Sequence, residues 1–192
     1  LLLARLGLPA VERAEHRSLL ADLRGGLREL TSREWMWVSL IQISVMNFCI
    51  SGGVFVLGPV LAAEQASGAL GWSVVIGLYT VGFLVGSLLA LRVTPRRPMR
   101  AATALSLGTA VPAAALALAA PIWLLALAMF VTGVSTDVAW VLSSGVTMTR
   151  IPEEALSRVG AFETLAAMVL VPVGFASVGP ISALFGVQQT LG

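Results

Sequence analysis

Residues 122–148, IWLLALAMFVTGVSTDVAWVLSSGVTM, form an uninterrupted apolar run with one charged side chain, Asp137. The run exceeds the ~20 residues that a helix needs to cross the hydrocarbon core of a bilayer. A charge at mid-span costs about 2.5–3.5 kcal/mol on insertion scales, whereas a Leu or Phe returns about 0.3–0.6 kcal/mol. We therefore expect a membrane helix that turns Asp137 toward a protein-lined or wet interior.

The rest of the chain has the same character. Of its 192 residues, 57% are hydrophobic and 11% are charged, and the mean hydropathy is +0.92. A soluble domain carries about 25% charged residues, so this composition predicts a membrane protein. The apolar runs do not alternate with period two, which excludes barrel strands. The predicted fold class is an all-α membrane protein, a multi-span helical bundle with five spans, at about residues 35–57, 71–91, 101–120, 122–148 and 161–185.

Arginine placement predicts the orientation of these spans. The connection after the second span holds Arg92, Arg96, Arg97 and Arg100, and the one after the fourth holds Arg150 and Arg158. The two opposite connections hold no basic residue. Short arginine-rich loops stay in the cytoplasm, so we expect the N-terminal segment inside and the C-terminal end outside. A multi-pass protein of the bacterial inner membrane is the predicted location.

The segment before the first span is different in kind. Residues 15–34, EHRSLLADLRGGLRELTSRE, mix charges with leucines at helical spacing, interrupted by Gly25 and Gly26. They fit an interfacial cytoplasmic helix, with a solvated linker as the alternative. The chain starts at Leu1 with an apolar stretch. We interpret residues 1–34 as the end of a preceding span plus a cytoplasmic amphipathic linker, and residues 35–192 as a transmembrane bundle that lacks its last span.

Several functional classes do not fit this composition. One cysteine, Cys49, cannot form a disulfide framework or a CxxC site within the chain. One histidine, His16, cannot build a histidine metal cluster. The pI is about 9.5, but the arginines lie beside spans and set topology, so we expect no nucleic-acid partner. Neither a metal nor a cofactor is expected.

Asp137 is the first candidate for a functional residue. Gly133, Trp140, Ser144 and Thr147 lie at helical spacings from it and should share its face. Asp137 could titrate with protons or balance a cationic solute in a central cavity. Alternatively, it forms a hydrogen bond between helices and has no role in coupling.

Other polar and small residues interrupt the apolar runs. Ser44, Asn47 and Ser51 form a second stripe, which either contacts a solute or joins two helices at roughly 0.6 kcal/mol per bond. Tyr79 and Trp72 are candidate cavity aromatics, or packing residues. Gly82 and Gly86 have the GxxxG spacing that permits close helix approach. Breaks in backbone hydrogen bonding are expected at three prolines, Pro112, Pro172 and Pro180, with a bend in VPVGFASVGP.

Three segments carry a family resemblance. DLRGGLRELTSREWMW is similar to the linker into the seventh span of major facilitator superfamily transporters, in the bacterial drug and macrolide exporter-like branch. GSLLALRVTPRRPMR resembles the connection between spans eight and nine, and RIPEEALSRVGAFETL the connection into span eleven. Ala90 and Leu91 stand where the fuller motif has an Asp-Arg pair. The resemblance implies the C-terminal half of the fold, spans seven to eleven, with cytoplasmic or gating roles for Gly86, Arg92, Arg96, Arg97 and Arg158.

The resemblance also implies a function. Two six-helix bundles would enclose a solute site near the bilayer midplane and rock between two access states. The expected activity is proton-coupled efflux of drug-like or amphiphilic molecules. The expected partners are a small-molecule solute, a proton, the lipid bilayer and the N-terminal half of the same transporter. Rival readings are a proton-linked importer, a dedicated metabolite or siderophore exporter, a membrane-embedded enzyme and an inert fragment. An enzyme fits poorly, because mid-membrane proteases and prenyl transferases need more than one acidic residue at that depth.

Overall fold

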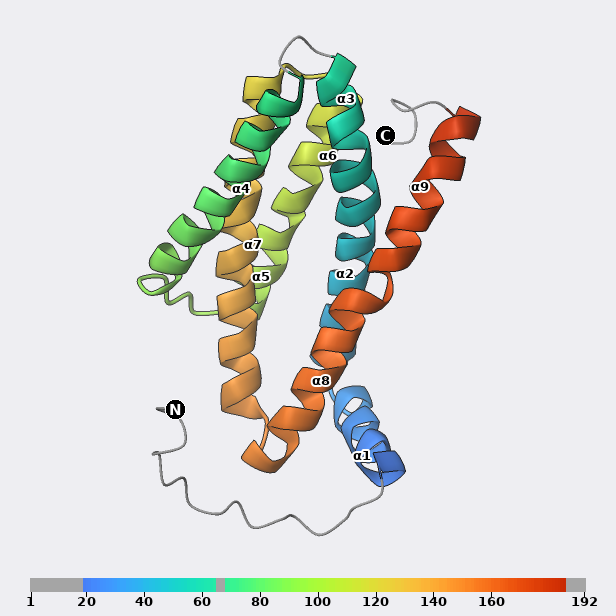
Figure 1. Ribbon diagram of the computed structural model, residues 1–192. Coiled ribbons are helices and arrows are strands. Elements are labelled where there is room, and N and C mark those ends of the chain that lie inside the picture. Colours follow the sequence, from blue (N-terminus) through green and yellow to red (C-terminus); the bar gives the residue numbers. More distant parts are fainter. Residues whose placement is uncertain (1–18, 65–67, 186–192) are drawn as a thin grey trace, which may run out of the picture.

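The computed structural model describes residues 19–64 and 68–185, and every regular element in these ranges is a helix. The all-α prediction is therefore confirmed for this part of the chain. Figure 1 shows the elements as a bundle of long, roughly parallel rods with one short helix, α1, at its lower end. In chain order they are α1 (Leu19–Thr31), α2 (Glu34–Cys49), the π-helix η2 (Ile50–Leu57), α3 (Gly58–Glu64), α4 (Gly68–Ala90), α5 (Pro98–Ser106), the 3₁₀ turn η3 (Leu107–Thr109), α6 (Ala110–Ala117), α7 (Ile122–Arg150), α8 (Glu153–Val169) and α9 (Val171–Phe185).

Four helical stretches in the described residues are long and apolar enough to cross a membrane, namely Glu34–Glu64, Gly68–Ala90, Ile122–Arg150 and Glu153–Ser182. The first combines α2, η2 and α3, and the last combines α8 with most of α9. They correspond to four of the five predicted spans. The last one begins eight residues earlier than the predicted start at residue 161, which places more of its sequence at membrane depth.

The third predicted span, residues 101–120, is not one continuous helix. It consists of α5, η3 and α6 in tandem, and α5 and α6 both pack along α7. Pro112 explains the interruption, because it has no N–H to donate to the carbonyl oxygen of Gly108 four residues earlier. The buried hydroxyl of Thr132, on α7, lies 3.2 Å from that oxygen. The same hydroxyl lies 2.9 Å from the carbonyl oxygen of Ala128 on its own helix, so its single proton is shared between two acceptors and compensates the break only in part.

Glycines bring α4 and α7 into direct backbone contact. A Cβ added to Gly82 would overlap the carbonyl oxygen of Phe130, and one added to Gly133 would overlap that of Tyr79. At Gly86 the added atom would lie 2.8 Å from the carbonyl oxygen of Val134. The close approach predicted from Gly82 and Gly86 is therefore confirmed, with Gly133 supplying the matching space on α7.

The predicted helix before the first span is present as α1, and its two glycines do not interrupt it. A Cβ on Gly26 would lie 2.6 Å from the Phe162 ring, and one on Gly25 would lie 3.0 Å from Nη1 of Arg158. The glycines let α1 rest directly on α8. The buried cluster beneath it consists of Leu30, Met36, Ile151, Ala155 and Val159.

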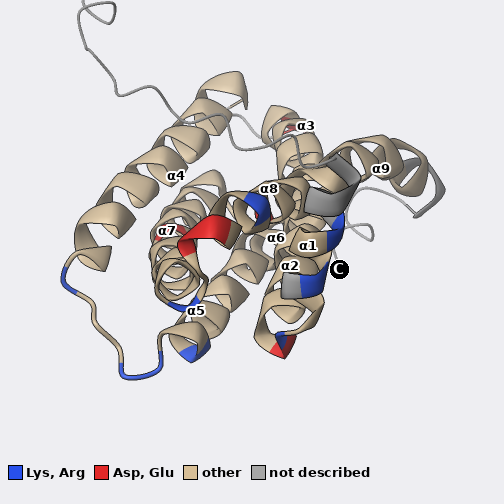
Figure 2. Ribbon diagram, turned by 90° about the horizontal axis from the view of Figure 1, so that it is seen from below, with Lys and Arg blue, Asp and Glu red and all other residues tan. Residues whose placement is uncertain are grey.

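The arginines gather toward the α1 end of the bundle. Figure 2, viewed from this end, shows basic segments on α1, in the connection between α4 and α5, and at the start of α5. In that connection, Arg92, Arg96 and Arg97 are exposed, and Arg100 is exposed on α5. A second buried cluster lies in the other half of the bundle, toward α3 and the α6–α7 turn. It consists of Val54, Leu61, Val75, Leu116, Leu125, Ala126 and Met129.

Candidate functional site

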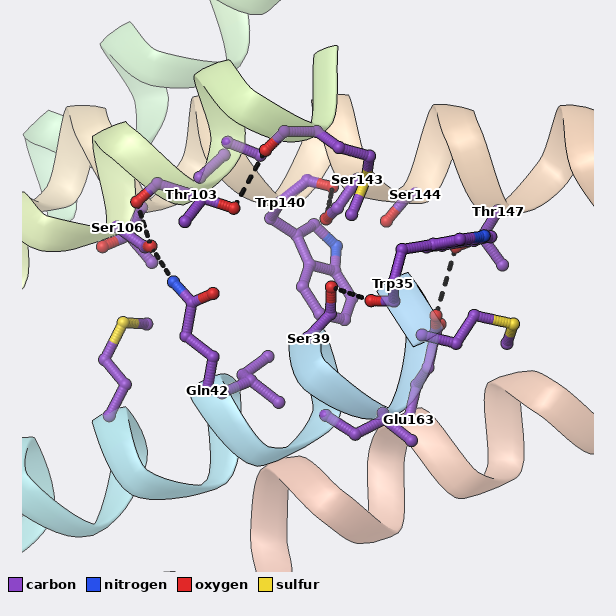
Figure 3. A pocket seen from close by; sticks show the side chains of 18 residues that line it. Trp35, Ser39, Gln42, Thr103, Ser106, Trp140, Ser143, Ser144, Thr147 and Glu163 are labelled. Atoms are coloured by element: carbon purple, nitrogen blue, oxygen red, sulfur yellow. Dashed lines mark hydrogen bonds between the residues drawn. The ribbon is translucent and has the colours of Figure 1, made fainter. Parts of the chain in front are cut away.

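A polar pocket opens between α2, α5, α7 and α8, with a volume of about 110 Å³. Its walls combine hydroxyl, amide, carboxyl, indole and thioether groups, drawn in Figure 3. Such a mixture of apolar walls and a few placed polar groups is typical of small-molecule sites. The polar and aromatic lining side chains are Trp35, Ser39 and Gln42 from α2, Thr103 and Ser106 from α5, Thr136, Trp140, Ser143, Ser144 and Thr147 from α7, and Glu163 from α8.

Glu163 carries the only ionisable group in this lining. The hydroxyl of Thr147 donates to its Oε1 at 3.2 Å, and Figure 3 shows this bond from α7 at one end of the pocket. The residue lies ten positions after Glu153, the first residue of α8, or about 15 Å along the helix axis. The carboxyl group is therefore inside the span and not at its end.

The sequence reading missed this role of Glu163. It placed the last span at residues 161–185, which puts Glu163 at the membrane surface. The start signals were nevertheless present, since Pro152 occupies the N-cap position and Glu153 and Glu154 fill the first turn. Acidic first turns after proline are typical of helix starts. With this start, Glu163 lies within the long apolar stretch Glu153–Ser182 and not at its first residues.

The structure places Asp137 outside the pocket lining, in the seam between α4 and α7. Ser87, on α4, donates its hydroxyl to Oδ2 of Asp137 at 2.7 Å. A Cβ on Gly86 would lie 2.9 Å from the Asp137 Cβ. Gly133 and Asp137 contact α4, whereas Trp140, Ser144 and Thr147, about one to three turns further along α7, line the pocket, so position along the helix separates residues of one face.

Trp140 and Ser144 line the pocket as predicted, whereas Tyr79 does not. The Tyr79 ring packs edge-to-face on Phe83, with ring centroids 4.8 Å apart, and on Phe55 at 6.2 Å. It belongs to the packing around the buried cluster between α4 and α7. Tyr79 is thus a packing residue, which was the second interpretation of it from the sequence.

Ser44 and Asn47 also lie outside the pocket lining and join α2 to α8. Ser44 Oγ lies 2.5 Å from the carbonyl oxygen of Ala166, and Asn47 Nδ2 lies 2.8 Å from that of Ala167. These two carbonyls belong to the last turn of α8, where helix ends leave acceptors without intrahelical donors. Ser44 and Asn47 therefore supply donors to carbonyl oxygens at the end of α8, just before the break that precedes α9.

The residues with predicted cytoplasmic or gating roles are dispersed. Gly86 packs against α7, while Arg92, Arg96 and Arg97 extend from the α4–α5 connection. Arg158 donates from Nη2 to the carbonyl oxygen of Glu154 at 3.2 Å and lies against α1. None of these five residues lines the pocket, and their gating role stays a prediction.

Comparisons with known proteins do not place the chain in a family. No family model matches it, and no curated protein or solved structure matches it significantly.

Proposed function

We propose that this chain belongs to a secondary transporter that moves an amphiphilic small molecule across the membrane in exchange for protons. The observation that carries the proposal is the pocket between α2, α5, α7 and α8 with the Glu163 carboxyl group in its wall. An ionisable residue inside a membrane span is costly, and such residues mark solute and proton pathways. The resemblance to the C-terminal half of major facilitator transporters supports the same function.

The lining favours an amphiphilic solute. Trp35 and Trp140 offer flat apolar surfaces, and the thioethers of Met36, Met46 and Met99 can adapt to different shapes. Hydroxyl and amide groups between them supply hydrogen bonds. Efflux of drug-like molecules is the activity that this mixture and the resemblance support, with import or export of a dedicated metabolite as the alternative.

Glu163 is the residue that we assign to proton coupling. When ionised, it favours a hydrated pocket or a cationic solute, and when protonated, it tolerates a dry, closed pocket. Alternation between these forms links protonation to access. Asp137, bound to Ser87 in the α4–α7 seam, remains a second candidate, because its half-buried carboxyl group also lies within a span.

Helix breaks support alternating access. The span made by α8 and α9 is interrupted at Leu170, next to Pro172, and the α5–η3–α6 segment is interrupted near Pro112. Interrupted helices beside a central site are typical of secondary transporters, because half-helices can move separately. The outer half of α9 could thus tilt while α8 keeps Glu163 in place.

The test uses proteoliposomes containing the protein expressed from its complete reading frame. We expect Glu163→Gln to remove the acceleration of solute movement by an imposed pH gradient, since Gln cannot exchange a proton. Solute exchange without a gradient should persist. Glu154→Gln is the matched control, because that side chain is exposed at the start of α8.

Unchanged proton coupling in Glu163→Gln would contradict the assignment of Glu163. A parallel Asp137→Asn variant then decides whether the second carboxylate carries the protons. The sign of the pH gradient that drives accumulation distinguishes efflux by antiport from import by symport.

A further inference from the structure

Gln42, on α2, has a side-chain amide whose orientation is fixed by α5. Its Nε2 donates to Oγ of Ser106, and Ser106 Oγ lies 2.8 Å from the carbonyl oxygen of Thr103. A serine hydroxyl has one proton, and here it is directed to that carbonyl. Ser106 can therefore only accept from Gln42, so the amide nitrogen must face Ser106 and the amide oxygen must point the other way.

The free oxygen of Gln42 points into the pocket. Figure 3 shows Gln42 at one end with its oxygen turned toward Trp140, and Glu163 at the opposite end. Within the described residues, no side chain or backbone group donates to this oxygen. The pocket thus presents an amide oxygen at one end and a carboxyl group at the other, with the indole of Trp140 between them and that of Trp35 at the Glu163 end.

We propose that Gln42 determines solute specificity by accepting a hydrogen bond from the end of the solute that is remote from its positive charge. The inference rests on the proposed transport function. The solute class is a small amphiphile with a protonated amine for Glu163, an apolar or aromatic body for the Trp140 indole, and an N–H or O–H donor for Gln42. The hydrogen bond that joins α2 to α5 involves only the amide nitrogen of Gln42, so the amide oxygen remains available to a solute.

The probe is a pair of aromatic amines that differ in one group at the far end, a primary amide in one and its N,N-dimethyl form in the other. Equilibrium binding to the purified full-length protein is measured by quenching of tryptophan fluorescence, and transport by uptake into proteoliposomes. A net hydrogen bond contributes about 0.5–1.5 kcal/mol, so the primary amide should bind roughly two- to tenfold more tightly.

Variants assign this preference to Gln42. Gln42→Leu should abolish the preference for the primary amide, so that the two compounds bind with equal affinity. Ser106→Ala keeps the amide but removes its anchor, so the preference should fall and not vanish. Glu163→Gln should weaken both compounds and keep their ratio. The Ser106 variant keeps the test valid if Gln42→Leu fails to fold.

The outcomes separate the two proposals. Equal binding of the two compounds, or a preference that survives in Gln42→Leu, overturns the role of Gln42 and leaves the transport function standing. Saturable binding of neither compound overturns this inference, whereas transport of other amphiphiles would still support the proposed function.

Discussion

Asp137 and Glu163 show that the same chemical group serves different purposes in different surroundings. Asp137 accepts a hydrogen bond from Ser87 in a seam between helices, and Glu163 accepts one from Thr147 in a pocket wall. Both are half-buried within spans. Residue type and depth identify both as unusual, but only their neighbours distinguish them.

Asn47 can be used to test whether a polar residue within a span joins two helices or contacts a solute. We expect Asn47→Leu to lower the free energy of unfolding by about 0.6–1.7 kcal/mol, because the bond to the Ala167 carbonyl oxygen is lost. Equilibrium unfolding in mixed micelles measures this change. Solute affinity should stay within twofold of the parent protein.

A selective loss of solute affinity in Asn47→Leu, with unchanged stability, would show that the amide contacts the solute after all. Gln42→Leu should lower the affinity for solutes that carry a hydrogen-bond donor, because Gln42 lines the pocket.

Neighbouring helices stabilise one another by supplying hydrogen-bond donors and by close backbone contact. Where a helix ends early, an adjacent helix supplies a donor, as Asn47 does for the Ala167 carbonyl oxygen. Near the break at Pro112, the Thr132 hydroxyl is shared between the carbonyl oxygens of Gly108 and Ala128. Where two helices must touch, glycine removes the side chain, as in the α4–α7 seam. Interrupted helices are thereby stable at membrane depth.

The α4–α7 seam predicts opposite effects for two glycines. Gly133→Ala places a methyl group against the Tyr79 carbonyl oxygen, so we expect a loss of about 1–3 kcal/mol in the free energy of unfolding. Gly77→Ala is the matched control on α4, where no atom lies within 4 Å of an added Cβ. It should be neutral or stabilise the helix by up to about 1 kcal/mol.

Thermal and denaturant unfolding of the two variants in the same detergent provide the measurement. Equal stability of Gly133→Ala and the parent protein would contradict the close backbone contact.

Among residues 19–64 and 68–185, the arginines lie toward one end of the bundle. Arg92, Arg96 and Arg97 leave the bundle between α4 and α5, near the α1 end. The membrane-spanning helices fit a location in a membrane, and the arginines predict which end faces the cytoplasm.

Orientation can be tested with single cysteines in a Cys49→Ser background. Thr94 is exposed in the α4–α5 connection, and Ala63 is exposed near the end of α3. We expect a membrane-impermeant maleimide to label Ala63→Cys in intact cells, and Thr94→Cys only after permeabilisation. The reverse labelling pattern would invert the orientation.

Local sequence was sufficient for the coarse architecture. Apolar length predicted five spans, four of which are long apolar helices in the described residues, because crossing a bilayer requires a minimum run of apolar residues whatever the helix contacts. The Gly82–Gly86 spacing predicted a close contact, and Pro112 and Pro172 predicted the breaks near Gly108 and Leu170, whereas α9 continues through Pro180. Each of these properties depends on residues within a few turns of one another.

The lining of the pocket could be identified only from the packing of the helices. The sequence offered six cavity candidates, namely Asp137, Trp140, Ser144, Asn47, Ser44 and Tyr79. Of these, Trp140 and Ser144 line the pocket, and the sequence could not distinguish them from the other four. A shift of one residue along a helix rotates a side chain by about 100° and moves it about 1.5 Å along the axis. A predicted helix boundary therefore does not determine which neighbouring helix a given side chain contacts. Gln42, Ser106 and Glu163 come from three helices, and their meeting depends on the rotation and relative height of all three.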